Sequence, residues 1–131
     1  MISVDALEKI EKYFTESSDA IVAAYVFGSS AAGRERRKSD IDIAIMARGP
    51  VGSFERVQME TKLANLLGKD VDLVIFGRAS PLLRHQILKY GRIVYEGDAR
   101  ERVSQEVMAR WEYLDSLRLY RILGEDTSHG G

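Results

Sequence analysis

The sequence predicts an α/β fold of the α+β type, with a mixed sheet of about four strands, packed helices and a long C-terminal helix. Two observations lead to this class. Short runs rich in β-branched and aromatic residues alternate with longer segments in which apolar residues recur every third or fourth position. Glycine and proline residues separate these segments, as they do where helices and strands end.

The first part of the chain is expected to form one helix and two strands. Residues 3 to about 14 carry a single apolar stripe, which is typical of a short helix. Residues 21–27 are nearly all apolar and therefore predict a strand that is covered on both faces. The polar stretch 33–38 is expected to be an exposed loop. The second strand, residues 40–46, follows this loop and ends before Gly49-Pro50.

The next two elements are a helix and a third strand. Ser53 has the residue type of an N-cap for a helix through Leu67, and Gly68 is placed to end that helix. The following run, residues 71–76, is apolar except for one carboxylate. We therefore expect a buried strand there.

A third helix and a fourth strand are expected after residue 79. Ser80-Pro81 opens the helix, because proline is tolerated in the first helical turn, and Gly91 ends it. Residues 92–95 then form a short strand.

The last predicted element is the longest. Asp98 and Glu101 have the spacing of a capping box, and the helix that they begin is expected to run to about Leu123. We therefore expect a single domain over residues 1–123 and a flexible, polar tail over residues 124–131.

The composition excludes several classes of protein. The net charge of −1 argues against a protein that coats nucleic acid, because such binding depends on many contacts of Lys and Arg with phosphates. The chain has no cysteine, so disulfides and thiolate metal sites are excluded. The N-terminal residues lack the pattern of a signal peptide, and no stretch is apolar enough for a membrane span. We therefore expect a cytoplasmic protein.

Three carboxylates stand at or near the starts of two predicted strands. Asp40 and Asp42 are two residues apart, so their side chains are expected to share a face, and Asp72 lies near the start of a later strand. If the two strands are neighbours, the acids converge and provide hard oxygen ligands. Mg²⁺ suits this donor set and is usually shared with substrate phosphates. The acids therefore predict a metal site and a nucleoside triphosphate.

Gly28 and Ser29 directly follow the first strand and support the prediction of a triphosphate. Glycine lets the backbone approach a phosphate closely, and free N–H groups at the start of a helical turn attract anions. In a two-metal arrangement one Mg²⁺ activates an attacking hydroxyl and the other holds the triphosphate. Asp72 is then a ligand or the base for that hydroxyl. The expected reaction is nucleotidyl transfer to an alcohol or phenol.

These motifs resemble the signature of the polymerase-β-like nucleotidyltransferase superfamily. The signature comprises Gly28-Ser29, the pair Asp40-x-Asp42 after ten intervening residues, and Asp72 on a later strand. Over essentially residues 1–123, the chain further resembles the small MntA-type antitoxins in four segments: 26–29, 39–42, 71–74 and 78–88.

The resemblance implies a nucleotidyltransferase fold and an activity. In the MntA-type family that activity is the Mg²⁺-dependent transfer of AMP from ATP onto a tyrosine of a partner HEPN-domain toxin, the HepT type, whose ribonuclease is thereby silenced. Residue by residue, the resemblance implies nucleotide binding by Gly28 and Ser29, and metal binding and catalysis by Asp40, Asp42 and Asp72.

The loop after Gly28 departs from the pattern of the family. Many relatives have Ala-Arg-Gly where this chain has Ala31-Ala32-Gly33, so an arginine that could face the triphosphate is replaced by Ala32. Arg34 and Arg36 are candidates to substitute for it. The efficiency of catalysis is expected to depend on this loop.

Several other polar and aromatic residues have a structural role as an alternative to a functional one. Asp70 is either a solvated neighbour of Asp72 or a helper of the site. The basic residues within 34–38 contact a nucleotide or an acidic partner, or only keep a loop soluble. His85 is expected to be structural. Helix packing is the simplest role, and an interface the alternative, for three aromatic residues of the last helix: Trp111, Tyr113 and Tyr120.

Three functions are compatible with these residues. The leading hypothesis is an adenylyltransferase antitoxin, and the second is a non-catalytic antitoxin that neutralises its toxin by binding. A small-molecule nucleotidyltransferase of the aminoglycoside type ranks below them, because such enzymes usually carry an additional domain for the acceptor. We expect no direct nucleic-acid or membrane binding. A homo- or hetero-oligomer is compatible with the sequence. The sequence does not determine the base preference, the number of nucleotides transferred or the toxin-binding surface.

Overall fold

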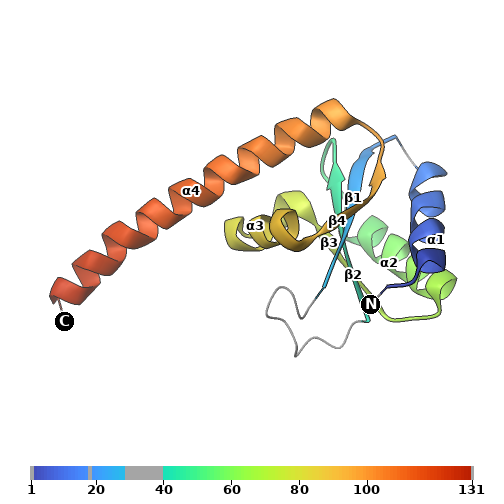
Figure 1. Ribbon diagram of the computed structural model, residues 1–131, viewed down its shortest axis with the longest axis horizontal. Coiled ribbons are helices and arrows are strands. Elements are labelled where there is room, and N and C mark those ends of the chain that lie inside the picture. Colours follow the sequence, from blue (N-terminus) through green and yellow to red (C-terminus); the bar gives the residue numbers. More distant parts are fainter. Residues whose placement is uncertain (1, 18, 29–39, 131) are drawn as a thin grey trace.

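One mixed β-sheet lies between two layers of helices in the computed structural model of the chain (Figure 1). The structure describes residues 2–17, 19–28 and 40–130, with side chains up to Gly124. The elements follow the predicted order, with a short 3₁₀ helix added: α1 (Val4–Thr15), β1 (Ile21–Phe27), β2 (Ile41–Ala47), α2 (Ser53–Leu67), β3 (Val71–Ile75), η1 (Phe76–Arg78), α3 (Pro81–Tyr90), β4 (Arg92–Glu96) and α4 (Ala99–Gly130). The predicted fold class is confirmed.

The strands of the sheet have the order β3-β2-β1-β4, so β1 and β2 are central and β3 and β4 form the edges. β1 pairs antiparallel with β2 and with β4, whereas β2 and β3 run parallel. The parallel pair is connected through α2, because parallel strands need a crossover and cannot be joined by a tight turn. The sheet is mixed, as the sequence predicts.

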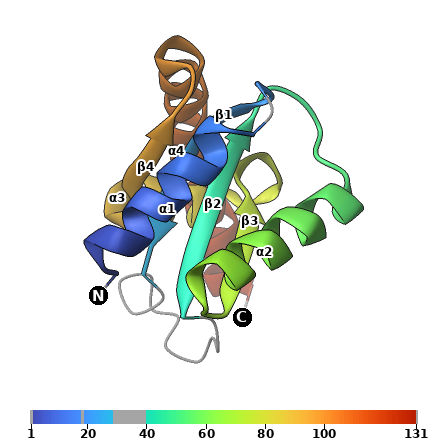
Figure 2. The same cartoon turned by 90° about the vertical axis from the view of Figure 1, so that its right-hand side faces the viewer.

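Different helices cover the two faces of the sheet. α1 and α2 lie on one face, and α3 and the first part of α4 lie on the other (Figure 1, Figure 2). Because side chains alternate along a strand, each central strand contributes to both cores. The core under α1 and α2 includes Ile10, Phe14, Ile41, Ile43, Ile45 and Leu63. The core under α3 and α4 includes Tyr25, Phe27, Ala44, Met46, Phe76, Ile87 and Ala109.

The N-termini of three helices are capped by side chains. The hydroxyls of Ser3 and Ser80 each accept a hydrogen bond from the backbone N–H three residues later, at 3.1 and 3.2 Å. Asp98 caps α4 by accepting a hydrogen bond from the Glu101 N–H at 3.0 Å. This is one of the two bonds of a capping box; the Asp98 N–H instead donates to the Val22 carbonyl at 3.2 Å.

The start of α2 differs from the prediction. Ser53 is the first helical residue, and Gly52 occupies the N-cap position with extended backbone angles. A cap is defined by its backbone conformation, which residue type alone does not determine. At the other end Gly68 adopts the left-handed conformation with φ of 65°, so its predicted role in ending α2 is confirmed.

The ends of the strands also differ slightly from the prediction. β2 begins at Ile41, because Asp40 lies in a bend directly before it. β3 ends at Ile75, because Phe76 turns into the 3₁₀ helix. β4 extends to Glu96. Such shifts arise because hydrogen bonding between strands, and not composition, sets where a strand ends.

The helix α4 continues past Leu123, where the sequence predicts its end, to Gly130. A glycine lowers helix stability without forcing a stop, so the glycine at position 124 does not end the helix. The flexibility predicted for residues 124–131 stays a prediction. No helix within the described ranges has both the length and the apolar character that crossing a membrane requires.

A buried polar network attaches α4 to the sheet. The hydroxyl of Tyr25 on β1 donates a hydrogen bond to Glu106 Oε2 at 2.7 Å, and Glu106 is only 8% exposed. Arg102 donates to the same carboxylate oxygen at 2.6 Å and to Glu96 on β4 at 2.5 Å. Burial, followed by the contact with Glu106, raises the pKa of Tyr25, so the hydroxyl remains a donor at neutral pH.

We expect Asp98→Asn to destabilise the protein at neutral pH and to have little effect in acid. Hydrogen bonds from the Glu101 N–H and the Arg48 guanidinium hold the pKa of Asp98 below its ordinary value of 3.8. A carboxyl with a lowered native pKa stabilises the fold above its unfolded-state pKa, and this contribution is lost as pH falls through the native pKa. The urea midpoints of wild type and variant should therefore begin to converge as pH falls through about 3.8 and should coincide below the lowered native pKa.

The control is Asp115→Asn, an exposed position farther along α4. Its midpoint should stay close to that of the wild type throughout the titration. A gap between wild type and Asp98→Asn that persists unchanged in acid would contradict the proposed charge interaction.

Candidate active site

Asp42 and Asp72 lie opposite each other on neighbouring strands. In the parallel register of β2 and β3, Asp42 pairs with Asp72 and Ala44 pairs with Val74. Neighbouring strands are about 4.8 Å apart, and residues at matching positions project to the same face. The prediction that the acids converge depends on their strands being neighbours. β2 and β3 are neighbours, so Asp42 and Asp72 lie side by side.

Both carboxylates project toward the face that α3 and α4 cover. Ala44 and Val74, each two residues farther along its strand, belong to the core under these helices. Asp42 is 2% exposed and Asp72 is half-buried. On the opposite side, Asp42 pairs in register with Phe27 at the end of β1. A carboxylate at the centre of a sheet is costly to bury unless a cation or hydrogen-bond donors compensate its charge.

Asp40 is placed differently from the other two acids. It lies in the bend before β2, so strand alternation does not fix the direction of its side chain. The Asp70 N–H donates a hydrogen bond to Asp40 Oδ2 at 3.4 Å. In the part of the chain that the structure describes, no three Asp, Glu or His side chains are grouped so that they could hold a metal ion. Joint metal binding by Asp40, Asp42 and Asp72 stays a prediction.

Asp70 contributes to the site through its backbone. Its carbonyl accepts hydrogen bonds from the N–H groups of Asp40 and Ile41 at 3.0 and 3.1 Å, while its side chain is exposed. These bonds fix the entry of the chain into β2 against the segment before β3. These are backbone contacts, and the exposed Asp70 carboxylate agrees with the solvated neighbour considered from the sequence.

A cavity of about 420 Å³ opens where β1 ends and β2 begins. Asp40 and Asp42 line it together with Gly28 and residues at the start of α1. Its volume is typical of sites for small organic ligands. Gly28 therefore lies beside two of the predicted acids. Ser29 and the loop positions Ala32, Arg34 and Arg36 lie outside the described residues, so the expectations for them stay predictions.

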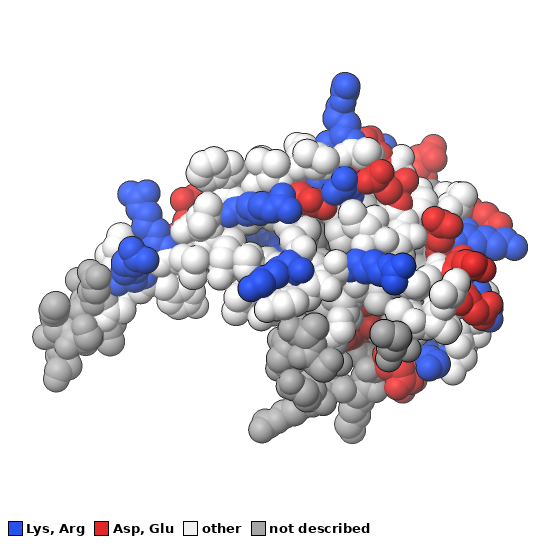
Figure 3. Space-filling view, viewed as in Figure 1, with Lys and Arg blue, Asp and Glu red and all other residues white. Residues whose placement is uncertain are grey.

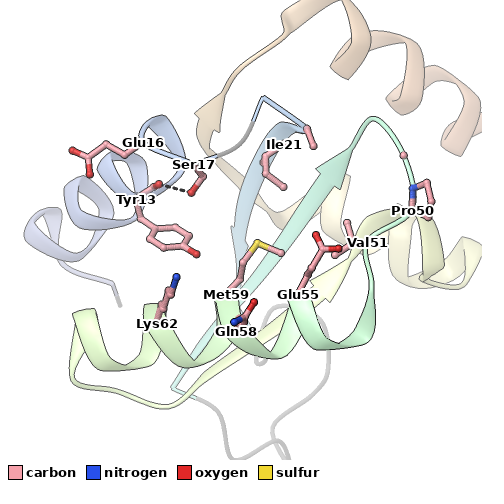
Figure 4. A pocket seen from close by; sticks show the side chains of 12 residues that line it. Tyr13, Glu16, Ser17, Ile21, Pro50, Val51, Glu55, Gln58, Met59 and Lys62 are labelled. Atoms are coloured by element: carbon pink, nitrogen blue, oxygen red, sulfur yellow. Dashed lines mark hydrogen bonds between the residues drawn. The ribbon is translucent and has the colours of Figure 1, made fainter.

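A second cavity, of about 500 Å³, lies between α1 and α2 at the opposite end of the sheet (Figure 4). Tyr13 from α1 and Lys62 from α2 point toward each other across it. Burial raises the pKa of Tyr13. The described residues that line this cavity include none of the predicted acids, so the smaller cavity beside Asp42 is the better candidate for chemistry.

Two side chains of α2 hold the edge strand β3 beside Asp72, and the sequence reasoning missed both. Glu60 Oε2 accepts a hydrogen bond from the Leu73 N–H at 2.8 Å. Arg56 donates to Glu60 at 3.1 Å and to the Leu73 carbonyl at 3.3 Å. Leu73 follows Asp72, so these contacts position the strand that carries the carboxylate. The only signal in the sequence was an Arg and a Glu four residues apart on a helix.

The structure confirms the predicted roles of some aromatic residues of α3 and α4 and contradicts those of others. His85 stacks on Tyr113 with ring centres 3.8 Å apart and an interplanar angle of 7°, so the structural role expected for His85 and the packing role expected for Tyr113 are confirmed. Trp111 and Tyr120 are 65% and 75% exposed. The prediction that Trp111 and Tyr120 pack within the domain is therefore wrong, because no other described element covers the faces of α4 that carry them.

The fold and its paired carboxylates place the chain among nucleotidyltransferases. The sequence model of the family described as Polymerase beta, Nucleotidyltransferase matches residues 8–100, which include Gly28, Asp40, Asp42 and Asp72. The chain belongs to this family.

Two curated relatives are protein adenylyltransferases by name. Protein adenylyltransferase MntA of Shewanella oneidensis is 37% identical over 84 residues, which are 64% of this chain and 60% of that protein. Putative protein adenylyltransferase MJ0435 of Methanocaldococcus jannaschii is 34% identical over 65 residues, which are 50% of this chain and 70% of that protein. The match thus spans less than two thirds of the Shewanella protein.

Solved structures match over more of the chain. A toxin–antitoxin structure with AMP-PNP is similar with a TM-score of 0.74 and 28% identity, covering 93% of this chain and 98% of that chain. A complex of tri-AMPylated Shewanella oneidensis HEPN toxin with MNT antitoxin is similar with a TM-score of 0.73 and 25% identity, covering 94% and 96%. The predicted resemblance to the MntA-type family is confirmed.

We expect Glu60→Ala to lower the free energy of unfolding by about 1–3 kcal/mol, because it leaves the Leu73 N–H without its acceptor and Arg56 without its carboxylate. Chemical denaturation measures this change. Gln58→Ala, an exposed position on the same helix, should stay within about 0.5 kcal/mol of the wild type. Equal stabilities of the two variants would mean that α2 does not hold β3 through Glu60.

Proposed function

We propose that the protein transfers AMP from ATP onto a tyrosine hydroxyl of a partner HEPN-domain toxin of the HepT type, and that it acts in this way as an antitoxin. The observation that carries the proposal is the register pair of Asp42 and Asp72, of which Asp42 lines a cavity that also reaches Gly28 and Asp40. The relatives named as protein adenylyltransferases and the solved toxin–antitoxin complexes support the choice of reaction and partner.

Asp42 and Asp72 fit a divalent cation by donor type and by placement. Carboxylate oxygens are ligands that Mg²⁺ prefers, and a cation compensates the charge of Asp42, which is 2% exposed. Asp40 lines the same cavity as Asp42 and is the third predicted ligand. When bound, two Mg²⁺ ions supply neutralisation of the triphosphate charge and activation of the acceptor hydroxyl.

The proposed reaction is a displacement at the α-phosphorus of ATP. The tyrosine oxygen forms a bond to this phosphorus, the bond to the oxygen that bridges to the β-phosphate breaks, and pyrophosphate leaves with that electron pair. Asp72, half-buried opposite Asp42, is the candidate base for the phenolic proton. Gly28 has no side chain, which leaves room for phosphate groups at the end of β1.

A non-catalytic antitoxin that neutralises the toxin by binding alone is the second candidate. Two observations favour it. Asp40 accepts a hydrogen bond from the Asp70 N–H, and Ala32 stands where many relatives have an arginine. In this alternative the carboxylates retain a structural role, and the antitoxin acts without consuming ATP.

We expect Asp42→Asn to reduce AMP transfer by about 10³-fold, because loss of one cation ligand removes several kcal/mol of transition-state stabilisation. The assay incubates the protein with α-labelled ATP, Mg²⁺ and a cognate HEPN-domain toxin and measures label on the toxin. Asp70→Asn keeps the backbone contacts of the exposed Asp70 and should stay within about threefold of the wild type. Removal of the metal by a chelator should abolish transfer.

The same variant separates the two candidate functions in cells. Under the enzymatic proposal, Asp42→Asn no longer neutralises the toxin although it accumulates to the wild-type level. Neutralisation that is retained by the variant, with no label transferred by the wild type, would replace the enzymatic proposal by the binding one.

A further inference from the structure

The outer part of α4, residues 114–123, extends beyond the rest of the fold (Figure 1). We call it the distal segment. α4 is held against α3 by an ion pair between Arg84 and Glu112 at 2.6 Å and by the stacking of His85 on Tyr113. Among the described residues, no side chain of residues 114–122 adds an ion pair or ring contact to another element. Residues 114–122 therefore project without an ion pair or ring contact to another described element.

The distal segment exposes apolar side chains in all directions around the helix axis, between the charged residues Asp115, Arg118 and Arg121. Six of its side chains are large, apolar and between 45% and 75% exposed: Leu114, Leu117, Leu119, Tyr120, Ile122 and Leu123. Successive residues of an α-helix are about 100° apart around its axis, so these positions point in every direction and do not form one stripe. Large apolar side chains that are exposed in several directions favour a contact on more than one side of the helix.

The distal segment is also too short to be a stable helix without contacts to other protein surfaces. Ten residues form a helix about 15 Å long, and isolated helices of this length are marginal in water. A contiguous exposed apolar surface of this kind marks a contact site. A protein that binds around the distal segment would bury these exposed apolar side chains.

The charges on α4 favour an acidic occupant over a second copy of this chain. Within the distal segment the exposed residues Arg118 and Arg121 outnumber Asp115, so its net charge is positive. Figure 3 shows this part of α4 as mostly white, with blue side chains and a smaller red area. Two copies packed through this segment would bring like charges together and cover only one side of each helix. A helical protein with an acidic surface covers several sides and pairs with the arginines.

The distal segment lies on the same side of the sheet as the candidate carboxylates. α3 and α4 cover the face toward which Asp42 and Asp72 project. A protein bound around the distal segment therefore lies on the same side of the sheet as these carboxylates, while the cavity beside Asp42 is also lined by residues at the start of α1.

We propose that the distal segment of α4 is the docking site for the acceptor protein, a helical protein with an acidic surface that packs on more than one side of this helix. The identity of that protein as a HEPN-domain toxin rests on the proposed function. The inference deepens that function by assigning the surface that binds the toxin.

The test measures binding separately from AMP transfer. The full chain and its double variant Leu117→Asp/Tyr120→Asp are titrated into a cognate HEPN-domain toxin without ATP, by calorimetry. We expect the variant to bind about 100-fold more weakly, because two buried apolar anchors are lost and two acids face an acidic surface. The matched control, Phe54→Asp/Leu82→Asp, replaces apolar residues that are 73% and 55% exposed on α2 and α3, and should bind within about threefold of the wild type.

The outcomes distinguish the docking site from the proposed reaction. If the wild type binds the toxin but transfers no AMP, while the double variant loses binding, the docking site stands and the reaction is wrong. If the wild type transfers AMP and the double variant binds as tightly, the docking site is wrong and the reaction stands. If the distal segment instead mediates a dimer of this chain, which light scattering detects and the double variant abolishes, the acceptor protein is not its occupant and the proposal is overturned.

Discussion

The parallel pairing of β2 with β3 is the constraint on which the candidate site depends. It places Asp42 opposite Asp72, and a shift of the register by one residue would send one of the two carboxylates to the other face of the sheet. Several contacts protect this register. α2 connects the two strands, the Asp70 carbonyl receives the N–H groups that lead into β2, and Glu60 fixes the backbone beside Asp72. These contacts around Asp42 and Asp72 keep β2 and β3 in a single register.

The sequence predicts the elements well because each combines a clear apolar period with a clear stop. β1 is correct at both ends, and Gly68 ends α2 through the left-handed backbone that its residue type permits. The pairing of Asp42 with Asp72 could only be stated as a condition, since strand order depends on contacts between distant segments. Asp40 was assigned to the strand because composition does not reveal a bend. Glu60 was missed because its partner is a backbone group of another element.

The helix α4 contains two regions with different sources of stability. Near its start, Glu106 accepts hydrogen bonds from Tyr25 on one side and Arg102 on the other, so a polar network inside the domain fixes the helix. Farther along, apolar residues such as Tyr120 find no cover within the described part of the chain. The packing role expected for the aromatic residues of α4 was therefore correct only for Tyr113, which stacks on His85 of α3.

The contacts of Glu60 and Arg56 with Leu73 have a consequence for solubility. β3 is an edge strand, and the exposed N–H and C=O groups of an edge can pair with a strand of another molecule. At Leu73 both groups are already hydrogen-bonded to side chains of α2. A strand from a neighbouring molecule would first have to displace an Arg and a Glu from this position. The same pair that steadies the carboxylate strand thus also blocks edge-to-edge aggregation at the point nearest to Asp72.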